Sequence, residues 1–236
     1  MIALILHDMR WRVLVLVGVA GLLYLLEPGF HQHDEFDLQA LYLGPLGISS
    51  TISYFAALTM IILLGGQISR DRQMGYSRLL FAHPVTPLSY YGLRLGIAYL
   101  VAIVGSVLFL AFGQIIAWGT FPRGWMGLLL PLLTALVYGG LVTFLSVVMP
   151  RGDAVTAFLL FLPTFLPAIL EIGLANASLS VRQLVLIILP PHGAVARVWE
   201  ALLDGRIAWI PALYVAAYGL VLLVAAGVIL RMREWP

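Results

Sequence analysis

The segment Gln67–Arg94, QISRDRQMGYSRLLFAHPVTPLSYYGLR, is the long polar interruption on the arginine-rich side of an otherwise apolar chain. It lies between two apolar runs, Leu46–Ile68 and Tyr91–Trp118, and each run is long enough to cross a bilayer as a helix. The segment contains several arginines, a glycine, a short apolar patch at Leu79–Phe81 and two prolines. This composition predicts a small folded projection at the membrane surface, suited to docking a separate soluble partner.

The composition of the whole chain indicates an integral membrane protein. Of its 236 residues, 62% are hydrophobic and 10% are charged, whereas soluble domains carry about 25% charged residues. The chain has no cysteine, which excludes disulfides and thiolate metal sites. No block of like charge suggests a nucleic-acid partner. We therefore expect an all-α integral membrane protein, with residues 1–236 forming a single transmembrane domain.

Six apolar runs approach or exceed the roughly 20 residues that a spanning helix needs. They are Trp11–Leu26, Leu46–Ile68, Tyr91–Trp118, Trp125–Met149, Ala154–Leu174 and Ile207–Leu230.

The first nine residues, Met1–Met9, predict a separate amphipathic helix lying on the membrane surface. We expect Arg10 and Arg12 to reach the interface beside Trp11. A cleaved signal peptide is the alternative. The late position of the charges and the lack of a small-residue cleavage site after Leu26 argue against it.

The distribution of arginine predicts the orientation. With the amino terminus inside, most arginines fall in cytoplasmic segments, and both termini are cytoplasmic under the positive-inside rule. The cytoplasmic set is Arg10, Arg12, Arg70, Arg72, Arg78, Arg94, Arg151, Arg231 and Arg233, and the outer set is Arg123, Arg182, Arg197 and Arg206.

The outer connection Asn176–Arg206 is long and partly apolar. Its apolar part, Leu184–Leu189, is too short to span and is followed by Pro190–Pro191. In His192–Leu203 the apolar residues recur at helical spacing. We expect a re-entrant segment followed by an amphipathic helix, packed over the outer mouth as a lid or vestibule.

Other polar residues allow two interpretations each. His31 and His33 could bind a divalent metal, but a flexible acidic loop accounts for them equally well, and we predict no metal site. Small and polar residues of the second span, and prolines of the fifth, could line a substrate path or serve only close packing and a static kink. The candidate path residues are Thr51, Tyr54, Pro163, Thr164 and Pro167.

Several short motifs resemble those of permeases of ABC type-2 transporters. In the polar segment these are Asp71-Arg72, Gly75, Leu79-Leu80 and Pro84-Val85-Thr86, and in the last third they are Pro190-Pro191, Val195–Leu203, Asp204-Gly205 and Arg231–Glu234. Their order and spacing, with the six-span layout, carry the resemblance over nearly the whole chain. The chain departs from the family at Gln73-Met74, where an acidic residue often precedes the glycine, and at Tyr76-Ser77-Arg78.

The resemblance implies a permease subunit of a prokaryotic plasma-membrane exporter. It would pair as a homodimer or heterodimer and bind two copies of a cytoplasmic ATPase. A coupling helix would cover Met74–Phe81. The residues expected to meet the ATPase are Arg70, Asp71, Arg72, Gly75, Arg78, Leu79, Leu80 and Pro84. The alternative interpretation is that these arginines only set the topology near anionic headgroups.

This chain has neither a G-x-x-x-x-G-K-[ST] motif nor any lysine, so we expect ATP and Mg²⁺ to be bound by the partner ATPase and the chain itself to be no enzyme. An ion-coupled secondary transporter would place charged residues near the middle of a span, and none falls there. A membrane-embedded assembly or anchoring factor without an ATPase partner remains an alternative. The substrate stays open among lipid, drug, peptide, glycan and haem.

Overall fold

The computed structural model describes residues 2–26, 49–75, 86–118, 124–149, 151–165, 178 and 189–232. All regular secondary structure in these ranges is helical. The elements are α1 (Ile2–Leu26), α2 (Ser49–Leu64), α3 (Gln67–Gln73), α5 (Pro87–Trp118), the 3-10 turn η3 (Trp125–Leu128), α6 (Leu129–Val148), α7 (Asp153–Phe165), α10 (His192–Leu203) and α11 (Trp209–Met232).

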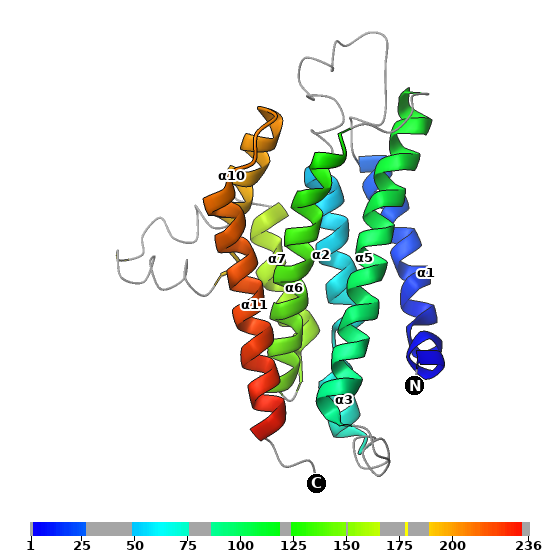
Figure 1. The fold of residues 1–236 in the computed structure, drawn as a ribbon. Coiled ribbons are helices and arrows are strands. Elements are labelled where there is room, and N and C mark those ends of the chain that lie inside the picture. The colour runs from blue at the N-terminus through cyan, green and yellow to red at the C-terminus, as the bar shows by residue number, and fades with distance from the viewer. Residues whose placement is uncertain are drawn as a thin grey trace.

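The long helices run side by side along one axis, with α3 at the lower end of the bundle and α10 at the upper end in Figure 1. We call these the α3 end and the α10 end. The first helix, α1, begins at the α3 end, and the last, α11, ends there (Figure 1). Both ends of the described chain therefore lie on the same side of the bundle.

Five helical stretches are long and apolar enough to cross a membrane, so the chain is a multi-pass membrane protein. They are Ile5–Leu26, Ser49–Gln73, Pro87–Ile116, Trp125–Val148 and Trp209–Met232. The fifth predicted span is represented by α7, which has only 13 described residues. Because residues 166–174 lie outside the described ranges, the count of six spans stays a prediction.

The centre of the bundle is formed by α2 and α6. The most apolar window of α2 is 78% buried, whereas that of α1 is 17% buried. The surfaces that α1, α5 and α11 leave exposed are largely apolar. Such surfaces suit contact with lipid, because hydrocarbon chains are as apolar as the side chains that face them.

The backbones of α6 and α11 touch at two glycines. A Cβ atom at Gly219 would lie 2.8 Å from the carbonyl oxygen of Leu136, and one at Gly140 would clash with the carbonyl oxygen of Gly219. Small residues at such crossings let membrane helices approach closely enough for backbone contact. No side-chain layer therefore separates α6 from α11 at this crossing.

The predicted separation of Met1–Met9 from the first span is wrong, because α1 is one continuous helix from Ile2. No glycine or proline interrupts this stretch. Ile5 and Met9 are buried on the same helix as Leu16 and Leu23, which repeat at near-heptad spacing.

The boundaries of the other helices differ from the predicted ones by a few residues. The second span breaks at Gly65-Gly66, where Gly66 has a left-handed φ of 74°, and resumes as α3. The third begins at Pro87, whose fixed φ suits a first helical position. Thr86 caps it by accepting a hydrogen bond from the backbone N–H of Ser89 at 3.2 Å. The amphipathic helix His192–Leu203 has the predicted bounds.

Candidate functional site

The short helix α3 lies between two glycines with left-handed backbone, Gly66 with φ 74° and Gly75 with φ 69°. Glycine adopts this conformation without the steric cost that a Cβ atom imposes. One side of α3 is buried in the bundle, and the other exposes Arg70, Gln73 and the adjoining Met74. The helix is therefore a small surface element with a fixed inner face.

A buried carboxylate attaches the start of α3 to its neighbours. Asp153, the first residue of α7, is 2% exposed. It accepts hydrogen bonds from the backbone N–H of Gly66 at 2.9 Å, from the Ser69 hydroxyl at 3.1 Å and from the Ser146 hydroxyl of α6. These contacts satisfy the buried carboxylate. They also join α3, α6 and α7 at one point.

Arg72 makes a second attachment to α6. Its guanidinium donates to the carbonyl oxygen of Val147 at 3.2 Å, next to the last residue of that helix. Carbonyls in the last turn of a helix have no partner within the helix. A positive charge there also interacts favourably with the negative end of the helix dipole. Arg72, which was predicted to meet a partner, is thus half-buried against α6.

Asp71 faces α5. The Tyr91 hydroxyl donates to its carboxylate at 3.2 Å, and Arg94 approaches the same oxygen to 3.9 Å. The Arg94 side chain is 4% exposed, and it also pairs with Asp8 of α1. Removing a partner from a buried charge costs several kcal/mol, so this pairing fixes α1, α3 and α5 relative to one another.

Arg12 also contributes to the α3 end. Its Nη1 atom donates to the carbonyl oxygens of Ile62 at 2.8 Å, Leu63 at 3.2 Å and Gly65 at 2.8 Å. These carbonyls lie where α2 stops. Arg12 therefore caps α2 from α1, and its predicted position at the lipid interface stays a prediction.

Of the predicted docking residues that the structure describes, only Arg70 is exposed. Asp71 and Arg72 face inward, and Gly75 forms the turn that ends α3. The rest of the set (Arg78, Leu79, Leu80 and Pro84), with most of the predicted coupling helix Met74–Phe81, lies outside the described residues.

Sequence reasoning missed α3 as a separate element and the anchoring role of Asp153. The first had a signal, since Gly65-Gly66 interrupts an apolar run; the position of Asp153 before the apolar periodicity of α7 indicates only where that helix starts.

Of the candidate path residues, Tyr54 lies at the contact of α2, α6 and α7. Thr51 is buried and Tyr54 is half-buried. The ring of Phe161 packs edge-on against Tyr54, at 6.2 Å between centroids, and against Tyr138, at 5.6 Å. Pro163 is buried on the same helix as Phe161. Aromatic rings occupy this contact. The side chain of Thr164 and the residue Pro167 lie outside the described part of the chain. The substrate path therefore stays a prediction.

Within the described residues, no group of three or more histidine, cysteine, aspartate or glutamate side chains could hold a metal ion. His31 and His33 lie outside those ranges, so the prediction of no metal site is untested. Comparison of the chain with protein-family models, characterised proteins and solved structures gives no match. Its function is therefore inferred from the arrangement of its own residues.

Proposed function

We propose that the chain is the membrane permease subunit of an ATP-binding cassette transporter, working as an exporter in a homodimer or heterodimer of permease chains. A separate ATPase subunit, present in two copies, would bind ATP and Mg²⁺ and dock at the α3 end. One observation carries the proposal: α3 is exposed on one side and hydrogen-bonded to three membrane helices on the other.

This geometry suits transmission of movement. A partner bound to the Arg70 side of α3 would act on α7 through Asp153, on α6 through Arg72 and on α5 through Asp71. Hydrogen bonds and ion pairs are directional, so a shift of α3 has to be followed by its bonded partners or break the bonds. An anchoring factor would need only the exposed side and not the bonds behind it.

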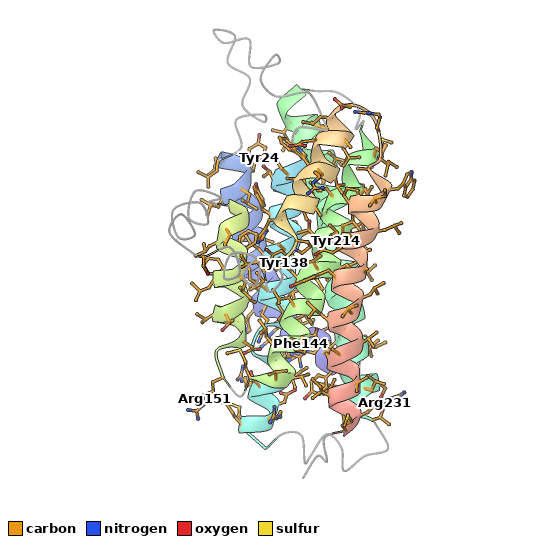
Figure 2. The ribbon with its side chains drawn as sticks, turned by 90° about the vertical axis from the view of Figure 1, so that its left-hand side faces the viewer. Tyr24, Tyr138, Phe144, Arg151, Tyr214 and Arg231 are labelled. Atoms are coloured by element: carbon orange, nitrogen blue, oxygen red, sulfur yellow. The ribbon has the colours of Figure 1, made fainter. Side chains whose placement is uncertain are left out.

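The arginine distribution supports a cytoplasmic position for the α3 end. Among the described residues, the arginines at this end are Arg10, Arg12, Arg70, Arg72, Arg94, Arg151 and Arg231, and those at the other end are Arg197 and Arg206. Figure 2 shows Arg151 and Arg231 together at the α3 end and Tyr24 near the opposite end.

Introduced cysteines test this orientation, since the chain has none of its own. In intact cells, an impermeant thiol reagent should label a cysteine replacing exposed Asp204 and leave one replacing exposed Gln73 unlabelled. If only the cysteine at Gln73→Cys is labelled, the chain has the opposite orientation and the α3 end lies outside the cytoplasm.

Copurification tests the docking. Affinity-tagged chain from native membranes should retain an ATPase, and Arg70→Glu should weaken that retention because it reverses the exposed charge of α3. Arg231→Glu is the matched control, since Arg231 is also an exposed arginine at the α3 end but lies on α11. Replacing Leu79 and Leu80 together by Asp extends the test to the adjoining segment. An ATPase retained equally by all variants would exclude docking at α3.

The ion-coupled transporter is supported less well. The buried Arg94, the half-buried Asp71 and the exposed Asp8 lie near the start of α5, in α3 and in the first turns of α1. All three positions are at the α3 end and away from the middle of the bundle, where coupled carriers bind their ions. Substrate uptake or export by purified chain that responds to an ion gradient without an ATPase would favour this alternative.

A further inference from the structure

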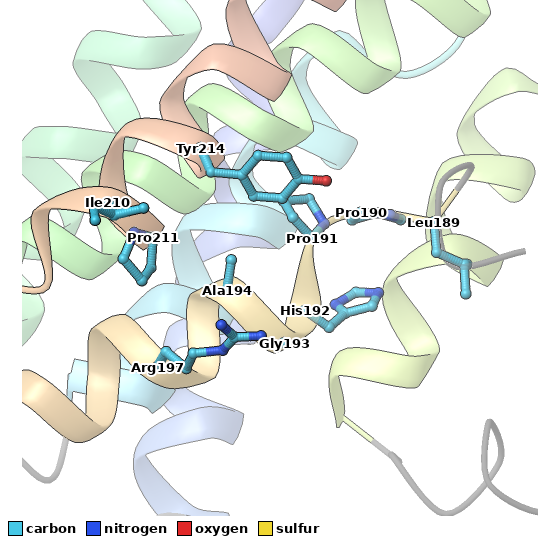
Figure 3. Close-up of a pocket in the computed structure, with 10 residues that line it drawn as sticks. All are labelled: Leu189, Pro190, Pro191, His192, Gly193, Ala194, Arg197, Ile210, Pro211 and Tyr214. Atoms are coloured by element: carbon cyan, nitrogen blue, oxygen red, sulfur yellow. The ribbon is translucent and has the colours of Figure 1, made fainter. Parts of the chain in front are cut away.

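A pocket of about 520 Å³ lies at the α10 end, between the start of α10 and the start of α11. Figure 3 shows Ile210 and Pro211 of α11 on one side and Pro190 and Pro191 on another, with Ala194 of α10 between them. Its size is within the range of small-molecule sites, roughly 300–1,000 Å³. The walls formed by these residues are apolar, so they suit an apolar group.

Arg197 brings a positive charge to this pocket. Its side chain is exposed, and Figure 3 shows the guanidinium lying back over the first turn of α10, near Gly193. Among the described residues, Arg197 forms no ion pair, whereas Arg206 pairs with Asp204. The charge of Arg197 is therefore available to an external anion, and a guanidinium can bind phosphate oxygens with two hydrogen bonds.

The other polar groups add no opposing charge. Burial lowers the pKa of the His192 imidazole to about 4, so this ring is neutral at pH 7. The Tyr214 hydroxyl lies toward Pro191 and can donate or accept a hydrogen bond (Figure 3). No acidic side chain lines the pocket among the described residues. At neutral pH the lining thus has one positive charge and two neutral polar side chains.

The pocket is continuous with the apolar outer surface of α11. Trp209 and Leu213 are each 65% exposed, and Ile210 is 83% exposed. Tryptophan and tyrosine at the end of a spanning helix mark the level of the lipid headgroups. An apolar group entering beside Ile210 would come from the hydrocarbon region, while its polar end would meet Arg197.

We infer that this pocket binds an anionic phospholipid of the surrounding leaflet, with the phosphate at Arg197 and the glycerol and upper acyl region against Ile210 and Pro211. The inference does not rest on the proposed function, since it involves only α10 and α11. A zwitterionic phospholipid also has a phosphate, but its cationic group would lie near the Arg197 guanidinium. No acidic side chain among the described lining residues would offset that repulsion. The site therefore favours a net negative headgroup.

Lipid titration of the full-length chain in neutral detergent, followed by native mass spectrometry, tests the inference. The probes are phosphatidylglycerol and phosphatidylcholine with the same acyl chains. Wild type should bind phosphatidylglycerol about fivefold more tightly, the effect of about 1 kcal/mol for one arginine at a membrane surface. Arg197→Gln should abolish this preference, and Arg206→Gln, at the same end but outside the pocket, should keep it. A preference unchanged in Arg197→Gln would overturn the inference.

A second variant fills the pocket without altering its charge. A Cβ atom at Gly193 meets nothing within 4 Å, so Gly193→Trp is compatible with the helix. It should weaken binding of phosphatidylglycerol, and unchanged binding would place the lipid elsewhere.

Inorganic phosphate at millimolar concentration should not displace phosphatidylglycerol. Displacement would show that the site recognises a soluble anion and would exclude the lipid.

Discussion

The two ends of the bundle are held together by different forces. At the α3 end, Arg12, Arg72, Arg94 and Asp153 connect different helices through hydrogen bonds and ion pairs. At the α10 end, α10 is held mainly by apolar packing: Val198 and Leu202 are fully buried in a cluster with Leu130 and Ala212. Directional bonds specify one arrangement, whereas apolar contacts tolerate small shifts. The helices at the α3 end are thus held in one defined arrangement, whereas α10 at the other end can shift slightly against its neighbours.

The largest effect is expected from an isosteric change at the α3 end. Asp153→Asn keeps the size of the side chain but replaces an acceptor with an amide donor facing Gly66, Ser69 and Ser146. Leaving buried donors unsatisfied costs about 1–3 kcal/mol each, so the free energy of unfolding should fall by about 3 kcal/mol. Denaturant unfolding in mixed micelles measures this.

The control for that change is Asp204→Asn at the opposite end. Asp204 is exposed and pairs only with the exposed Arg206 among the described residues. Its replacement should change the free energy of unfolding by less than about 1 kcal/mol, because exposed ion pairs contribute little. Equal losses for Asp153→Asn and Asp204→Asn would remove the distinction between the two ends.

Arg12→Met should lower the free energy of unfolding by about 2 kcal/mol, since the last carbonyls of α2 lose their external donor. Arg10→Met is the matched control: Arg10 is exposed and lies over the ring of Trp11. Hydrogen exchange should show that Arg12→Met loosens the end of α2 near Gly65. If the two arginine variants are equally stable, capping by Arg12 contributes nothing.

Acid should loosen the α10 end. The folded pKa of His192 is about 4, below its ordinary value of 6.5, so the unfolded chain takes up a proton first as the pH falls. The stability contributed by the neutral ring is present above pH 6.5 and is lost between about pH 6.5 and 4. We expect a loss of about 1 kcal/mol at pH 5 after allowing for partial exposure of the ring. His192→Phe should remove this part of the pH dependence in thermal unfolding, and an identical pH profile would show that His192 is not its source.

The smallest effect is expected from an isosteric change at the α10 end. Leu202→Met keeps the volume of a fully buried side chain and should cost less than about 1 kcal/mol. Leu202→Ala is the positive control, with a cost of about 2–3 kcal/mol from the lost contacts and the cavity. A loss for Leu202→Met as large as that for Asp153→Asn would mean that packing at α10 is as specific as the polar network at α3.

The helices themselves were largely predictable from local sequence. Apolar runs of the required length predicted most of the long helices, and the spacing of Val195, Val198 and Leu202 predicted α10 with its observed bounds. The errors arose where one pattern contains two elements. The apolar run through Gly65-Gly66 appeared as one span, although Gly66 separates α2 from α3.

The anchoring of α3 was not predictable, because it depends on contacts between residues far apart in the chain. Arg12 is 50 residues or more from the carbonyls that it caps, and Asp153 is 84 residues from Ser69. An arginine near a membrane helix end has the same local pattern whether it reaches headgroups or caps a neighbouring helix. Only the packing of α1 against α2 distinguishes these two outcomes.

The glycine crossing between α6 and α11 has a mechanical consequence. At Gly140 and Gly219 the two backbones meet directly, with the side chains of Leu222 and Leu136 packed beside the glycines, so the helices are in close contact there. We expect the closely packed pair to move together, with Val147, the acceptor for Arg72, near one end and Ile210, which lines the pocket, near the other. A tilt of α6 where it meets α3 would then also displace the start of α11 at the α10 end.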